Sequence, residues 1–155
     1  MKKDIKSLSP RLALLPLATI LGSWLGAMVA DLIMNIDLTS IMPHRSLSDC
    51  MALNSGFAYY SLSSIFITEY RGAELGTIAL LANIIREMIT LLLTPLLAKW
   101  FGPLAPISTG GATTMDTTLP IITQTIGQRY VALSIYHGFV TDFSVPFLVT
   151  MWCML

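Results

Sequence analysis

Charged residues, cysteines and histidines are scarce in this chain. Only 12% of its 155 residues are charged, whereas about 25% is usual for a soluble domain. The 9 lysines and arginines are matched by 9 acidic residues, so no excess positive charge is available to hold nucleic acid. Two cysteines and two histidines are too few for a disulfide framework or a structural zinc cluster. The sequence therefore argues against a nucleic-acid-binding domain or a secreted miniprotein, and it predicts no metal and no cofactor.

Long hydrophobic runs take the place of the missing charges. Hydrophobic residues make up 54% of the chain, and the mean hydropathy is +0.71. A run of about 18 or more apolar residues can cross the roughly 30 Å hydrocarbon core of a bilayer. Five such segments lie at about residues 12–34, 50–68, 75–97, 103–126 and 130–155. The sequence thus predicts an all-α integral membrane protein that forms a single transmembrane domain over residues 1–155.

The first segment is preceded by basic residues that bear on its orientation. They are Lys2, Lys3, Lys6 and Arg11. Such a cluster predicts a cytoplasmic N-terminus. A signal peptide has a similar pattern, but this apolar run exceeds the roughly 7–15 residues typical of one, so we expect an uncleaved helix.

Small residues recur at every fourth position of the first segment. They are Ala18, Gly22, Gly26 and Ala30. Residues four apart share one face of a helix, and small side chains let a second helix approach closely. The pattern predicts a helix-packing ridge, which we name the small-residue ridge.

The second segment, 50–68, carries many small polar side chains. Tyr59 and Tyr60 lie near its middle rather than at an interface with the lipid headgroups. We expect one continuous helix with protein neighbours on several sides, and at least one tyrosine hydroxyl in a polar interior. A pure packing role for both tyrosines is equally compatible with the sequence.

Two charges lie at the centre of the third segment, 75–97. Arg86 and Glu87 are too far from its ends to reach an interface, and each costs about 2.5–3.5 kcal/mol to insert there. Asn83 and Glu87 belong to a polar stripe at helical spacing. Adjacent residues of a helix point about 100° apart, so Arg86 and Glu87 should reach different partners. We favour a functional role over a structural ion pair.

The fourth segment, 103–126, is the least helix-like. It contains three prolines and a run of glycines, threonines and one acid, including Gly110, Gly111, Thr113, Thr114 and Asp116. Glycine and threonine propagate a helix poorly and proline breaks it. Irregular backbone at membrane depth is tolerated only where it is buried in protein or lines a watery cavity. We expect a broken or re-entrant helix pair with Asp116 near its tip, although a polar surface loop has a similar composition.

The last segment, 130–155, brings two further candidates. His137 lies on a face with hydroxyl residues, where a hydrogen-bonded core histidine is more common than a ligand. Asp142 lies four residues before Pro146, which lacks the N–H that would bond the Asp142 carbonyl. We expect a kink there, with Asp142 beside an opened backbone.

The charges within the segments point to a class of cargo. Glu87, Asp116 and Asp142 against Arg86 leave two net negative charges. Spare carboxylates in a membrane interior suit a cationic cargo, protons or another coupling cation, and broken helices are typical of secondary transporters. The chain has no phosphate-binding P-loop and no zinc-protease motif, and its aspartates lack the context of an intramembrane protease. We therefore predict a transporter and not an enzyme.

Four segments resemble the bacterial lysine exporter (LysO) family, specifically its C-terminal half. They cover residues 54–64, 72–88, 101–120 and 137–147, and the most specific stretch, 110–120, reads Gly-Gly-Ala-Thr-Thr-Met-Asp-Thr-Thr-Leu-Pro. The resemblance implies export of L-lysine and its toxic analogues across the cytoplasmic, or inner, membrane in exchange for protons or another cation. It also places the family's intramembrane acids on Glu87 and Asp116.

Family members are about twice as long, so the resemblance implies a missing N-terminal half. We expect a second small membrane subunit, or a homo-oligomer, to complete the transporter, with the small-residue ridge as a docking face. In the resulting hypothesis Glu87 and Asp116 bind ammonium groups, and Arg86 with the backbone of 110–114 receives the carboxylate. Asn83, Asp142 and His137 complete the candidate site. A non-transporting accessory protein, or a transporter of sodium or another organic cation, remains the alternative.

Overall fold

The computed structural model describes residues 10–37 and 46–155, and this part of the chain is helical without strands. Its elements are η1 (Pro10–Leu14), α2 (Leu15–Asp37), α3 (Leu47–Asn54), α4 (Tyr60–Arg71), α5 (Ala73–Phe101), α6 (Ala105–Gly110), η2 (Gly111–Met115), α7 (Leu119–Ile126), η3 (Gln128–Tyr130) and α8 (Val131–Met154). The orienting lysines Lys2, Lys3 and Lys6 lie outside the described residues.

Three helices are long and apolar enough to cross a membrane. They cover Arg11–Ile33, Ala73–Phe101 and Gln128–Met154 and correspond to the first, third and last predicted segments. Large apolar side chains such as Leu92 and Phe143 are exposed, whereas Asn83, Thr90 and His137 are buried. Polar groups inside and apolar groups outside are the arrangement expected when the surroundings are lipid. The structure confirms the prediction of an all-α membrane protein.

The prediction of one continuous helix over 50–68 is wrong. α3 ends at Asn54 and α4 begins at Tyr60, and both Phe57 and Ala58 between them have positive φ angles, of 43° and 68°. A non-glycine residue with positive φ costs free energy, so tertiary contacts must hold this break. Gly56 is required there, because a β-carbon at this position would collide with the side chain of Asn83.

The break in the fourth segment is confirmed. α6 ends at Gly110, the chain passes through η2, and α7 begins only at Leu119. Gly111 caps the C-terminal end of α6 and has a φ of 60°. Glycine suits this position because residues with a side chain rarely adopt such a φ. Residues 46–155 therefore contain two interrupted helices, α3–α4 and α6–η2–α7.

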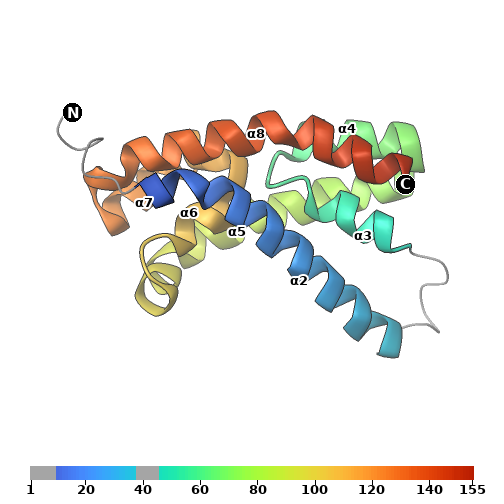
Figure 1. Cartoon of the computed structure of the whole chain (residues 1–155), viewed down its shortest axis with the longest axis horizontal. Helices are drawn as coiled ribbons and strands as arrows, with labels where there is room; N and C mark the ends of the chain where they lie inside the picture. Colours follow the sequence, from blue (N-terminus) through green and yellow to red (C-terminus); the bar gives the residue numbers. More distant parts are fainter. Residues whose placement is uncertain (1–9, 38–45) are drawn as a thin grey trace.

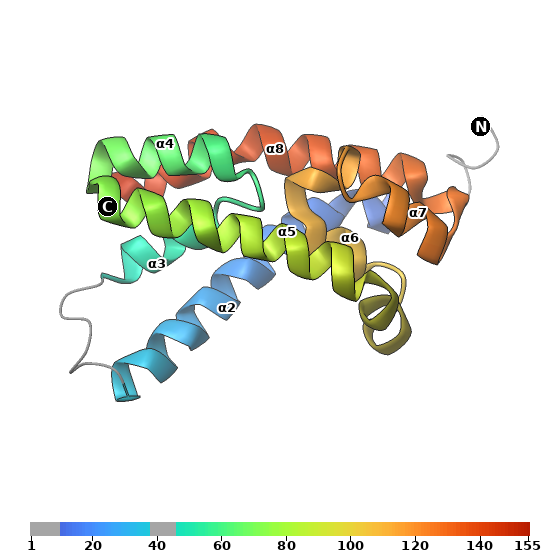
Figure 2. The same ribbon diagram turned by 180° about the vertical axis from the view of Figure 1, so that it is seen from behind.

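The interrupted helices lie between the long helices α5 and α8. In Figure 1, α8 runs the length of the molecule, with α3 and α4 towards its C-terminal end and α6 and α7 towards its N-terminal end. α4 packs against both α5 and α8, and η2 packs closely against α8. α2 packs on α3, α8 and α6, and Figure 2 shows its C-terminal end leaning away from the other helices.

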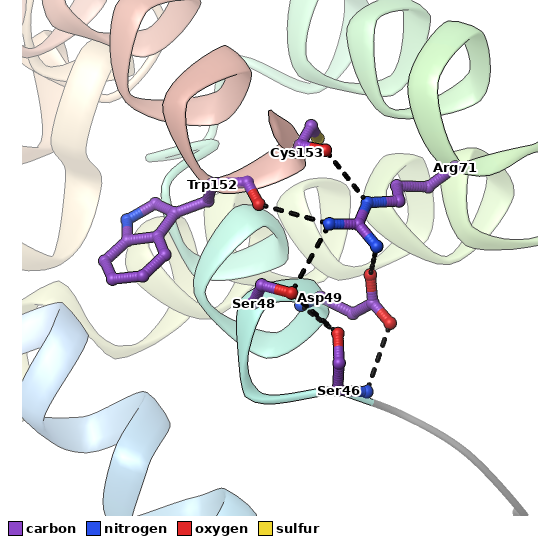
Figure 3. A network of polar contacts seen from close by, with 6 residues as sticks. All are labelled: Ser46, Ser48, Asp49, Arg71, Trp152 and Cys153. Atoms are coloured by element: carbon purple, nitrogen blue, oxygen red, sulfur yellow. Dashed lines mark hydrogen bonds and ion pairs between the residues drawn. The ribbon is translucent and has the colours of Figure 1, made fainter. Parts of the chain in front are cut away.

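One end of this arrangement is fastened by Arg71 (Figure 3). Its guanidinium donates from Nε to the Cys153 carbonyl oxygen at 3.1 Å, and Nη1 lies 3.6 Å from a carboxylate oxygen of Asp49. Asp49 also completes the N-terminal cap of α3 with Ser46. A basic side chain at the last carbonyls of a helix satisfies groups that have no partner within the helix. Arg71 thus ties the end of α4 to the start of α3 and the end of α8.

Candidate functional site

The two interrupted helices cross at their breaks. The backbone N–H of Ala112 donates to the carbonyl oxygen of Phe57 at 2.9 Å. Gly111 makes this approach feasible, since a β-carbon there would fall against the Phe57 carbonyl. Phe57 and Ala112 are both buried, so the bond joins two buried peptide groups. We call this region, 55–59 against 110–118, the crossing.

Asn83 holds the crossing from the side of α5. Its Oδ1 accepts from the Ala58 N–H at 2.8 Å, and its Nδ2 donates to the Ala79 carbonyl at 2.9 Å and to Ser63 Oγ at 3.3 Å. Every polar group of this side chain is therefore engaged within the protein. Asn83, predicted as a binding residue, is placed as a support of the break between α3 and α4.

A cavity of about 220 Å³ opens beside the crossing and collects three carboxylates. Glu87 comes from α5, Asp116 follows η2, and Asp142 comes from α8. The other lining residues are Ala58, Tyr59, Tyr60, Ser61, Ala112, Thr113, Met115 and Thr117. None of the lining residues is basic, so negative charges concentrate here without a cation among them. We call it the acidic cavity.

Asp116 is the exposed carboxylate of the acidic cavity and is hydrogen-bonded to its neighbour Thr117. One carboxylate oxygen of Asp116 accepts from the backbone N–H and the hydroxyl of Thr117. Glu87 and Asp142 are half-buried. The three carboxylates of the acidic cavity thus differ in their exposure.

Arg86 points to a different place. It lines an open groove of about 530 Å³ together with Ala18, Thr19, Gly22, Ser23, Gly26, Asn54, Ser108 and Thr109. Its Nε donates to the Thr109 carbonyl at 2.9 Å, Nη2 donates to Ser108 at 3.4 Å, and the guanidinium carbon lies 5.3 Å from the centre of the Phe57 ring. Adjacent Arg86 and Glu87 thus line different cavities. Their spacing predicts different partners, and Arg86 has carbonyl partners on α6. We call this the Arg86 groove.

The remaining predicted residues lie in the packed interior. His137 contacts Thr19 Oγ1 through Nε2 at 2.9 Å and Thr114 Oγ1 through Nδ1 at 3.4 Å, and it is fully buried. Thr114 also donates to the Ser134 carbonyl. Gly110 is packed against Thr114 and Thr118. Of the predicted set, the acidic cavity brings together Glu87, Thr113, Asp116 and Asp142 only.

Some cavity residues were absent from the predicted site. Tyr59, Tyr60, Ser61 and Thr117 line the acidic cavity. Tyr59 and Tyr60 could have been identified from the sequence, because tyrosines in a membrane segment are usually found at its ends and not in its middle. Ser61 follows directly after them, and only the break at 55–59 turns it towards the carboxylates.

A family model described as lysine exporter LysO matches residues 1–153. The lysine exporter LysO of Escherichia coli is 34% identical over 132 residues, which is 85% of this chain and 40% of that protein. A putative lysine exporter of Haemophilus influenzae is 38% identical over 99 residues, 64% of this chain and 50% of that protein. The chain therefore spans half or less of the length of these curated relatives, and no solved structure matches it significantly. By the extent of the family match, this chain belongs to the lysine exporter LysO family.

Proposed function

We propose that the chain is part of a secondary transporter that exports L-lysine and lysine analogues across the cytoplasmic membrane. The observation that carries the proposal is the acidic cavity, where carboxylates from three separate elements meet without a basic lining residue. Uncompensated charge at membrane depth is costly, so its retention favours a cationic cargo. The names of the two relatives add support for lysine as that cargo.

The chemistry of lysine fits the cavity. Lysine carries an ammonium at each end and a carboxylate at one end. Glu87 and Asp142 are half-buried while Asp116 is exposed, so the two ammonium groups find acceptors that differ in exposure. The hydroxyl of Ser61, which lines the same cavity, is a donor for the carboxylate. We assign Glu87, Asp116 and Asp142 to the cargo.

We further propose that transport is an exchange. A half-buried carboxylate that binds an ammonium group is left with an unpaired charge when the cargo leaves. This costs free energy unless another cation takes the place of the ammonium group. A proton or a small cation entering from the other side meets that need. Such coupling makes export of one lysine depend on entry of positive charge.

The test is efflux of labelled lysine from cells that lack other lysine exporters. Glu87→Gln, Asp116→Asn and Asp142→Asn should each lower efflux by about 10- to 100-fold, the effect of losing a charged hydrogen bond of about 1.5–3 kcal/mol. Glu74→Gln is the matched control, because Glu74 is an exposed acid on the first turn of the same helix and lies outside the cavity.

The outcomes separate the candidate functions. Normal efflux in all three cavity variants would refute the assignment of the acids. If the wild-type chain lies in the membrane with the rest of its transporter present but exports no lysine, efflux of labelled arginine, ornithine and sodium identifies another cargo. If the substitutions change only the stability of a complex, the chain is an accessory protein.

We also propose that the chain works together with further membrane segments, supplied by a second subunit or by a second copy. Its relatives are at least twice as long as the part that it matches. Co-purification with and without cross-linking tests this point. A chain that exports lysine as an isolated monomer would contradict it.

A further inference from the structure

The Arg86 groove presents polar groups where the fold otherwise presents apolar ones to lipid. Between α2, α3, α5 and α6 it is lined by half-buried hydroxyls, an amide and a guanidinium. They belong to Ser23, Asn54, Arg86, Ser108 and Thr109, and the buried Thr19 also lines the groove. Arg86 lies near the middle of α5, far from either end. Polar side chains at such depth face protein or water-filled space and not hydrocarbon, so the groove needs a cover.

Arg86 lacks a carboxylate partner among residues 10–37 and 46–155. Its hydrogen bonds go to the carbonyl oxygens of Ser108 and Thr109. The central acids Glu87, Asp116 and Asp142 all line the acidic cavity, and none of them lines the groove. A guanidinium with spare donors at membrane depth is complementary to a carboxylate on whatever covers it.

The small-residue ridge forms the rim of the same groove. Ala18, Gly22 and Gly26 line it, and all three are exposed in the described structure. A β-carbon at Gly22 or Gly26 would meet nothing within 4 Å. The ridge is therefore not used for packing within these residues and is free for the close approach of another helix.

We propose that the Arg86 groove and the small-residue ridge together receive a transmembrane helix from the part of the transporter that lies outside this chain's match to its relatives. That helix carries a carboxylate at the level of Arg86 and packs its backbone against Gly22 and Gly26. A second copy of this chain fits less well, because its central acids already line its own acidic cavity. This inference rests on the proposed function only in assuming that further membrane segments complete the transporter.

Photo-cross-linking in native membranes tests the docking face. A diazirine amino acid is placed at Ser23, which lines the groove beside the ridge glycines, or at Leu25, which lies about 200° around α2 at nearly the same depth. Leu25 is 63% exposed and absent from the groove lining, so it is the matched control. The adducts are identified by mass spectrometry of the cross-linked peptides.

We expect Ser23 to cross-link to a peptide that aligns with the unmatched part of the relatives, and Leu25 to give no such product. Arg86→Gln should lower the Ser23 adduct about tenfold or more, the effect of losing a charged hydrogen bond. Arg86→Glu combined with a lysine in place of the partner's acid should restore it. Membrane abundance and the unfolding midpoint of each variant show that the fold persists.

Three results would overturn the inference. A Ser23 adduct no stronger than that of the Leu25 control means that the face meets lipid. An adduct between two copies of this chain means that a second copy fills the groove. An adduct that survives Arg86→Gln while lysine binding weakens makes Arg86 a ligand of the cargo. Loss of efflux in Glu87→Gln with an intact adduct bears on the proposed function alone.

Discussion

Gly111 is the residue at which a single added methyl group tests the crossing. It has a φ of 60°, and a β-carbon there would fall against the carbonyl oxygen of Phe57. That oxygen accepts the 2.9 Å hydrogen bond from Ala112. Gly111→Ala therefore strains the backbone at residue 111 and pushes the two interrupted helices apart.

The magnitude follows from these two effects. A side chain in a backbone region reserved for glycine costs about 1–3 kcal/mol. Breaking a buried hydrogen bond and stranding its groups adds about 1–3 kcal/mol. Gly111→Ala should thus lower the free energy of unfolding by about 2–6 kcal/mol.

Gly102→Ala provides the matched control. Gly102 has a φ of 87°, but a β-carbon there would meet nothing within 4 Å. This variant carries the backbone strain without the collision, so we expect a loss of only about 1–3 kcal/mol.

Equilibrium unfolding of the full chain in mixed micelles, followed by tryptophan fluorescence as the SDS fraction rises, measures both variants. Equal losses in Gly111→Ala and Gly102→Ala would refute the reasoning, because the contact with Phe57 would then contribute nothing.

Three further substitutions test the supports of the site. Asn83→Ala strands the buried Ala58 N–H and should lower the unfolding free energy by about 2–4 kcal/mol in the same assay, and an unchanged midpoint would contradict its supporting role. Arg71→Gln frees the last carbonyls of α8 and should cost only about 1 kcal/mol, since the pair is partly exposed. The Arg71→Gln variant should also show faster amide hydrogen exchange in the last turn of α8, and an unchanged exchange rate there would contradict the role of Arg71 at this helix end. His137→Leu removes the contacts to Thr19 and Thr114 and should cost about 1–3 kcal/mol, whereas lost efflux at full stability would instead indicate a part in transport.

Local chemistry made much of this fold predictable. The long helices follow from uncharged runs, and the break after Gly110 follows from the glycines and prolines around it. The divergence of Arg86 and Glu87 follows from helical geometry alone. Local sequence does not predict that three acids line one cavity, because only the packing of α5, η2 and α8 brings Asp142 to Glu87 and Asp116.

The break between α3 and α4 lies beyond local reasoning. Residues 55–59 contain one glycine and no proline, so nothing in the segment itself forbids a helix. The break is held by contacts distant in sequence, from Asn83 to Ala58 and from Ala112 to Phe57. Gly56 was the one local hint, since its missing side chain makes room for Asn83.

The hydrogen bond between the two breaks constrains how such a protein can move. Separating Phe57 from Ala112 would leave two peptide groups unpaired in a low-dielectric interior, so the two unwound segments should travel as one body. If the proposed transporter opens its acidic cavity to alternate sides of the membrane, this body would have to slide as a unit against its neighbours.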